Sequence, residues 1–214
     1  GILPVPTSAA LNEDEVTKLA TVLKPDAVIG TGTVALPASC ARVLSPAEVA
    51  DGPAIKTIAE TRADDPAYIV FTSGTSGTPT GVVHAHRAIW ARRAMIRGWT
   101  GCTAEDRLLH AGAFNWTYTL GTGLLDPWSL GATALVLADG LALETIPDLA
   151  AQHRATILAG APGVFRKLLH RSLPALPDLR PALSAGEKIP ETLRSAWKHA
   201  TGTDIHEALG QSDC

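Results

Sequence analysis

The sequence is poor in the features that would tie it to a membrane, a disulfide framework or nucleic acid. Its three cysteines, Cys40, Cys102 and Cys214, lie far apart without a CxxC pair. That usage is typical of a reducing compartment, so we expect a cytoplasmic protein without disulfides or structural zinc. No apolar run approaches the roughly 20 residues that a membrane span needs. A net charge of −3 and the lack of a basic, aromatic cluster exclude nucleic acid as an expected partner.

The residues that are present describe a globular chain with a large apolar core. Hydrophobic residues make up 46% of the sequence and charged residues 18%, which is typical of folded rather than disordered proteins. Short apolar runs alternate with helical patterns. We therefore predict an α/β fold with mostly parallel sheets flanked by helices. Its expected parts are a first α/β subdomain over residues 1–66 and a second over residues 67–214.

Local signals place the individual elements. Asn12 with Glu15 and Ser45 with Glu48 each form the capping-box pattern that starts a helix. Ala67–Phe71 predicts a buried strand, Val82–His84 a second extended segment, and residues 85–99 a helix. Beyond these, strands are expected at 107–111, 132–137, 155–159, 181–184 and 204–208. The helices expected between them cover 117–130, 146–153, 162–171 and 190–200.

A loop rich in glycine and hydroxyl side chains follows the strand at 67–71. Thr72-Ser73-Gly74-Thr75-Ser76-Gly77-Thr78-Pro79-Thr80-Gly81 combines small residues with little steric obstruction around the backbone. Its amide and hydroxyl groups are able to form a nest for phosphate oxygens. A plain surface turn is the alternative for such a composition. A Walker-type loop is disfavoured, because its lysine is absent and an extended segment, not a helix, follows.

The order of these residues resembles the phosphate loop of the adenylate-forming superfamily, which includes acyl-CoA synthetases, luciferases and peptide-synthetase adenylation domains. The resemblance implies that the loop binds ATP with Mg²⁺, and that Thr72 also takes part in catalysis. The family's lysine is replaced by Thr80, so the loop itself brings no positive charge to the triphosphate. The nucleotide-binding residues implied in this loop are Thr72, Ser73, Gly74, Thr75, Ser76, Gly77 and Thr80.

Two further segments resemble the superfamily's acyl pocket. Ala111–Tyr118, followed by Pro127–Ala132, matches the segment that carries an aromatic residue and a histidine in relatives; here Asn115 replaces that histidine. Leu158–Pro162 matches a strand-to-helix turn. The alternative for the aromatics is an ordinary core position. The acid-binding residues implied by the resemblance in these segments are Phe114, Asn115, Trp116 and Ala161.

Two later turns complete the resemblance. Leu183–Glu187 matches a turn whose backbone faces adenine and the acyl group, which implies nucleotide contacts from Ala185, Gly186 and Glu187. Glu207–Asp213 matches the segment that flanks adenine and holds the metal. It implies that Ser212 donates to the α-phosphate and that Asp213 binds Mg²⁺ in place of the family's glutamate. The remaining implied contacts are Glu207, Ala208 and Leu209 at adenine, and Gly186 and Gly210 at the acid.

Some chemically suggestive residues are interpreted more plainly. His84 and His86 form an HxH pair, but no third ligand lies nearby in the sequence, so we interpret them as ordinary polar residues at a strand end. The arginines of the helix expected at 85–99 are interpreted as its solvated face. They are Arg87, Arg92, Arg93 and Arg97.

The resemblance implies ATP-dependent activation of a carboxylic acid through an acyl-adenylate, with transfer to CoA. The sequences of the matching segments are most similar to those of benzoate-type CoA ligases. An adenylation domain that loads a carrier protein and a non-catalytic nucleotide-binding module remain alternatives. A homodimer is a candidate assembly. Relatives are much longer, so we expect the chain to be a fragment of the large N-terminal domain that is inactive alone.

Overall fold

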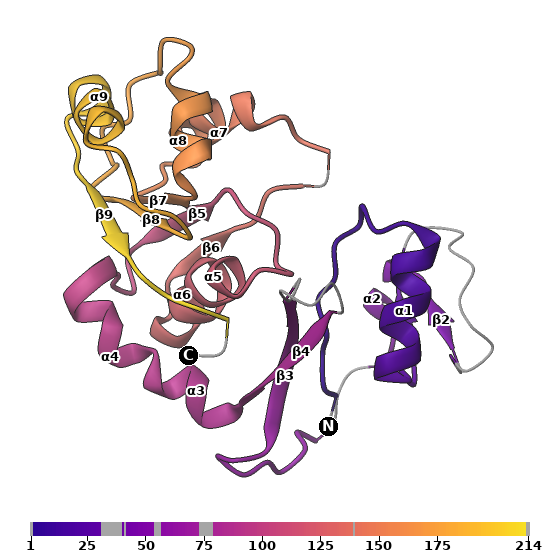
Figure 1. The fold of residues 1–214 in the computed structure, drawn as a ribbon. Helices are drawn as coiled ribbons and strands as arrows, with labels where there is room; N and C mark the ends of the chain where they lie inside the picture. The colour runs from indigo at the N-terminus through magenta and orange to yellow at the C-terminus, as the bar shows by residue number, and fades with distance from the viewer. Residues whose placement is uncertain are drawn as a thin grey trace.

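The computed structural model describes residues 2–30, 40, 42–53, 57–72, 79–138 and 140–212. Its centre is a parallel sheet of five strands in the order β6-β5-β7-β8-β9 (Figure 1). The predicted fold class, α/β with mostly parallel strands flanked by helices, is confirmed. The strands of this sheet are β5 (Arg107–His110), β6 (Thr133–Leu135), β7 (Ile157–Gly160), β8 (Ala182–Ala185) and β9 (Ile205–Ala208).

Helices connect successive strands and cover both faces of the sheet (Figure 1). Between β5 and β6 lie α5 (Thr117–Leu120), η2 (Gly121–Leu125) and α6 (Asp126–Leu130). Between β6 and β7 lie η3 (Leu143–Thr145) and α7 (Ile146–Gln152). The last two crossovers are α8 (Pro162–Leu168) and α9 (Glu191–Thr201). The positions of these elements agree with the strands and helices predicted after residue 107.

The core has two layers because successive side chains of a strand point to opposite faces. Leu109 and Leu158 belong to one apolar cluster, whose largest buried side chains include Phe165 of α8 and Trp197 of α9. These two rings meet edge to face, with centroids 4.9 Å apart. The neighbouring strand residues, Leu108, Ile157 and Leu183, belong to the second cluster together with Ile96 and Tyr118.

A separate two-stranded unit carries the predicted phosphate loop. β3 (Pro66–Thr72) and β4 (Thr80–Ala85) pair antiparallel, from Tyr68 opposite His84 to Thr72 opposite Thr80. The connection of seven residues suits a hairpin, because a parallel crossover requires a dozen or more. Beyond β4, the helix predicted at 85–99 forms as three consecutive segments. They are α3 (His86–Ala91), α4 (Arg93–Met95) and the π-helix η1 (Ile96–Thr100).

The N-terminal region contains two helices and two short strands among the described residues. It contains α1 (Glu13–Leu23), β1 (Val28–Ile29), β2 (Val43–Leu44) and α2 (Pro46–Ala50). Both predicted capping boxes are confirmed, at Asn12 with Glu15 and at Ser45 with Glu48. The division at residue 66 stays a prediction. Across the described part of the chain, no helix has the length and apolar character that crossing a membrane requires.

Candidate active site at the carboxyl ends of the strands

The strand order creates a switch point between β5 and β7. The chain passes from β5 to β6 on one side, whereas β7, β8 and β9 follow on the other side of β5. In open α/β sheets, ligands bind outside the carboxyl ends of the strands at such a point. Here the Ala111 amide, directly after β5, donates to the Ala159 carbonyl of β7 at 2.8 Å, which continues the pairing of the two strands to their carboxyl ends. The predicted acid-binding residues Phe114–Trp116 and Ala161 therefore belong to the two loops that leave the switch point.

The turn after β8 meets the loop after β5 through Gly186 and Trp116. Gly186 has a φ of +101°, and a Cβ added to it would lie 2.9 Å from Cζ2 of Trp116. The Trp116 ring in turn contacts Tyr118 edge to face, with centroids 5.0 Å apart. Phe114 packs elsewhere, against the apolar cluster of Tyr68, Val70 and their neighbours beneath the hairpin. The structure thus brings Trp116 to Gly186 and directs Phe114 towards β3.

Several buried side-chain atoms close to this point have no hydrogen-bond partner among the described residues. His110, the last residue of β5, accepts a hydrogen bond at Nδ1 from the Gly112 amide at 3.0 Å. Burial lowers the pKa of His110 to about 3, so the ring is neutral. With Nδ1 accepting, Nε2 carries the proton, and within the described residues this atom has no partner. The same is true of the buried hydroxyls of Thr117, Thr119 and Ser184.

Burying a polar group without a hydrogen bond costs free energy, so natural cores hold few of them. Their concentration around β5 and α5 gives the switch point hydrogen-bonding capacity inside an apolar shell. This combination is typical of small-molecule sites. Sequence reasoning missed His110, because a histidine within an apolar strand has no recognisable motif.

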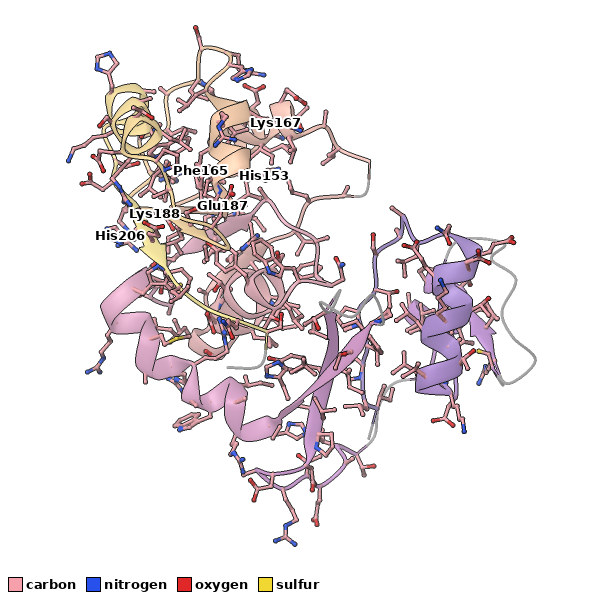
Figure 2. The ribbon with its side chains drawn as sticks, in the orientation of Figure 1. His153, Phe165, Lys167, Glu187, Lys188 and His206 are labelled. Carbon is pink, nitrogen blue, oxygen red and sulfur yellow. The ribbon has the colours of Figure 1, made fainter. Side chains whose placement is uncertain are left out.

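The predicted adenine-side residues gather where β8 and β9 end. Figure 2 shows Glu187 and Lys188 in the turn after β8. Glu207 on β9 accepts from the Ile189 amide and pairs with Arg194, both at 2.9 Å, which ties this turn to the neighbouring strand. A shallow surface hollow lies here, lined by Lys188, Ile189, Pro190, Glu191, Arg194 and Glu207. Leu209 follows with 99% of its side chain exposed. Its predicted adenine contact stays a prediction.

After β9 the chain turns back past α5 and α6 towards the hairpin (Figure 1). There the Ser212 carbonyl accepts a hydrogen bond of 2.7 Å from Nε2 of His84, a residue of β4. Across the hairpin itself, the Thr72 hydroxyl donates to the Thr80 carbonyl at 3.4 Å. The contact of His84 with Ser212 brings the predicted α-phosphate donor to the strand that leaves the predicted phosphate loop.

Part of the predicted site falls outside the residues that the structure describes. This applies to Ser73, Gly74, Thr75, Ser76 and Gly77 of the loop, and to the predicted metal ligand Asp213. Among the residues that are described, no group of three or more His, Cys, Asp or Glu side chains is arranged to hold a metal ion. The roles assigned to all these positions stay predictions.

The prediction that all four arginines of the helical segment are solvated is wrong for Arg92. Its guanidinium binds both carboxylate oxygens of Asp126 at 2.8 Å and the Thr122 hydroxyl at 3.2 Å. The side chains are 16% and 4% exposed. The pair joins the junction between α3 and α4 to α6 across 34 positions of sequence, and such a long-range contact leaves no periodic signal. His84 was also interpreted too plainly, since its ring stacks on Tyr68 with centroids 4.7 Å apart.

The chain is similar to known proteins along its whole length. The family model described as "AMP-binding enzyme" matches residues 1–214, so the chain belongs to the AMP-binding enzyme family. That family is the adenylate-forming superfamily indicated by the loop motif.

Among curated proteins, the chain is 35% identical over 153 residues to a 3-hydroxybenzoate--CoA/4-hydroxybenzoate--CoA ligase of Thauera aromatica. It is 34% identical over 158 residues to the human mitochondrial acyl-coenzyme A synthetase ACSM2A. These matches cover 70% and 72% of this chain, but only 29% and 27% of the relatives.

Solved structures agree on the fold. A benzoate CoA ligase from Burkholderia xenovorans superposes with a TM-score of 0.85 at 24% identity, over 99% of this chain and 46% of that one. The anthranilate CoA ligase AuaEII, solved with anthranoyl-AMP, gives the same TM-score at 21% identity, covering 99% of this chain and 45% of that one.

Proposed function

We propose that this chain belongs to an enzyme that activates an aromatic carboxylic acid with ATP, through an acyl-adenylate, and transfers the acyl group to CoA. The observation that carries the proposal is the convergence at one edge of the sheet. Segments predicted to bind the acid, adenine and α-phosphate leave β5, β7, β8 and β9 on the same side, and His84 joins the last of them to the hairpin. The similarity to hydroxybenzoate and acyl-CoA ligases supports this assignment.

The acid is proposed to bind at the switch point, between the loops after β5 and β7. Trp116 offers a flat aromatic wall next to Gly186. Ala161, which follows the neighbouring strand β7, adds only a small side chain. A flat, apolar acid suits such surroundings because ligand pockets are mostly apolar with a few polar groups. The neutral imidazole of His110 is one of the polar groups available nearby.

ATP is proposed to lie along the ends of β8 and β9, with its phosphates directed to the hairpin loop. The turn Ala185–Glu187 and the segment Glu207–Leu209 would face adenine, Ser212 would donate to the α-phosphate, and Thr72–Gly77 with Thr80 would surround the terminal phosphates. Asp213 is the proposed ligand of Mg²⁺, which supplies positive charge to the phosphates when bound. Because Thr80 replaces a lysine, the loop relies on backbone amides and hydroxyls.

In the proposed reaction, a carboxylate oxygen of the acid attacks the α-phosphorus and pyrophosphate leaves. The CoA thiol then attacks the acyl carbon, and AMP leaves with the bonding electrons. Preorganised donors stabilise the negative charge that develops on the phosphate oxygens, and loss of one such donor typically costs about 10²–10³ in rate. The described residues proposed as donors are Thr72 and Ser212.

The proposal is tested by incubating the complete gene product with ATP, Mg²⁺, CoA and a panel of aromatic and aliphatic acids. We expect AMP release that depends on both CoA and one class of aromatic acid. AMP release with a phosphopantetheinyl carrier protein but not with CoA would replace the ligase by a carrier-loading adenylation domain. No AMP release with any acid or acceptor would leave no support for an adenylating enzyme.

We further propose a cytoplasmic location, supported by the scattered cysteines, of which Cys40 and Cys102 are free thiols.

A homodimer is proposed as the assembly. Light scattering coupled to size-exclusion chromatography tests the assembly, since a mass equal to that of one chain at all concentrations would exclude it.

A further inference from the structure

The contact of His84 with Ser212 is the longest-range polar link at the candidate site. It joins β4 to the segment after β9 across 128 positions of sequence, at 2.7 Å between Nε2 and the carbonyl oxygen. A carbonyl oxygen only accepts hydrogen bonds, so the imidazole must donate from Nε2. The direction of this bond is therefore fixed by chemistry. A side chain at this position must bring a donor to hold Ser212.

The His84 ring is itself held in place from the other side. It stacks nearly parallel on Tyr68, with an interplanar angle of 14°. Tyr68 lies directly opposite His84 in the β3–β4 pairing and is 4% exposed. The cross-strand partner thus fixes the plane of the imidazole, so that the hydrogen bond does not depend on a freely rotating side chain.

The segment that His84 contacts begins with exposed residues. Leu209 is 99% exposed, and Gly210 is also exposed. A Cβ added to Gly210 would meet nothing within 4 Å. A glycine in open space leaves the backbone free to adopt many conformations. The hydrogen bond at Ser212 is therefore well placed to decide where this stretch lies relative to the hairpin.

We propose that His84 is a positioning residue for nucleotide binding, which holds the Ser212 carbonyl and so fixes residues 209–212 against the hairpin that carries the predicted phosphate loop. This inference rests on the proposed function, because it assigns the fixed segment to the α-phosphate side of ATP. His84 acts through Ser212, without touching the nucleotide. It adds a residue that neither the loop motif nor the segment after β9 includes.

The test compares His84→Leu, which fills similar space without a donor, with His84→Gln, whose side-chain amide is able to donate. His86→Leu is the matched control, because it removes a nearby histidine for which the described residues show no side-chain partner. Hydrogen–deuterium exchange of a peptide covering residues 205–212 measures the position of the segment. Titration with ATP and Mg²⁺ measures the nucleotide affinity. A peptide from β7 reports on the global fold.

We expect His84→Leu to speed exchange at residues 209–212 and to weaken ATP binding about three- to tenfold, the range for loss of one hydrogen bond. The β7 peptide should be unchanged, His86→Leu should behave like the wild type, and His84→Gln should recover most of both effects. A general packing role would not be rescued by glutamine, so the rescue separates positioning from stability.

Unchanged exchange in His84→Leu would overturn the inference, as would faster exchange with undiminished ATP affinity. Equal damage in His84→Gln and His84→Leu would overturn it as well. If the wild-type chain itself binds no ATP at millimolar concentration while the exchange results hold, the proposed function fails and the nucleotide part of the inference with it. The exchange data thereby separate failure of the contact from failure of the function.

Discussion

Gly186 is a position where the backbone conformation and a close neighbour at the candidate site both disfavour a side chain, and Gly186→Ala tests this directly. The residue follows β8 with a φ of +101°, a conformation that side chains with a Cβ rarely adopt. The new methyl group would also lie 2.9 Å from Cζ2 and 3.1 Å from Cη2 of Trp116. The substitution therefore adds backbone strain and a close contact at once.

The backbone strain and the close contact each destabilise the folded chain by a similar amount. Backbone strain of this kind costs about 1–3 kcal/mol, and overpacking against a neighbour costs a further 1–3 kcal/mol, roughly. Trp116 is not free to move away, because its ring packs against Tyr118. We expect Gly186→Ala to lower the free energy of unfolding by about 2–6 kcal/mol in total.

Urea denaturation of four chains separates the terms: wild type, Gly186→Ala, Trp116→Phe and the double variant. Phenylalanine lacks the outer ring atoms that the methyl group would meet, so the cost of Gly186→Ala should fall by about 1–3 kcal/mol in that background. Gly202→Ala is the control, because Gly202 has a φ of +75° and nothing within 4 Å of its added Cβ. It should show backbone strain alone.

If Gly186→Ala lowered the free energy of unfolding no more than Gly202→Ala does, the close contact with Trp116 would add nothing. If Trp116→Phe left the effect of Gly186→Ala unchanged, the two residues would not be in contact.

The remaining predictions concern buried ionisable side chains. Replacing Arg92 by Met leaves the Asp126 carboxylate buried without its partner, so the free energy of unfolding should fall by about 3–5 kcal/mol. The double variant Arg92→Met with Asp126→Leu should recover part of that loss. A loss below about 1 kcal/mol in urea denaturation of Arg92→Met would contradict a buried pair. Burial lowers the pKa of His110 from 6.5 to about 3, so the unfolded chain binds a proton that the folded chain excludes. Its contribution to stability is complete above pH 6.5 and falls as the pH drops towards 3. His110→Asn should flatten this decline, and an unaltered slope of stability against pH would show that His110 is not buried.

The sequence was sufficient for much of the fold because its local signals agree with one another. Capping boxes at Asn12 and Ser45 placed two helix starts to the residue, and Gly202 ends α9 in the left-handed conformation expected of a terminal glycine. The strands of the parallel sheet were found from short apolar runs. The helix predicted at 85–99 was less accurate, because the structure divides it into three segments that end in a π-helix.

The candidate site was predictable where it follows ordered motifs and not where it depends on contacts between distant elements. Trp116 and Gly186 were named from separate segments, and the structure brings them together. The bonds of Arg92 with Asp126 and of His84 with Ser212 join residues 34 and 128 positions apart. No periodicity or spacing records such pairs, so they become visible only once the strands are in place.

The proposed function depends on formation of an acyl-adenylate, and exchange of labelled pyrophosphate into ATP measures that step without CoA. With the complete gene product, Mg²⁺ and an aromatic acid, we expect label to enter ATP at a rate that depends on the acid. A folded protein that shows no exchange with any acid tested would exclude acyl-adenylate formation.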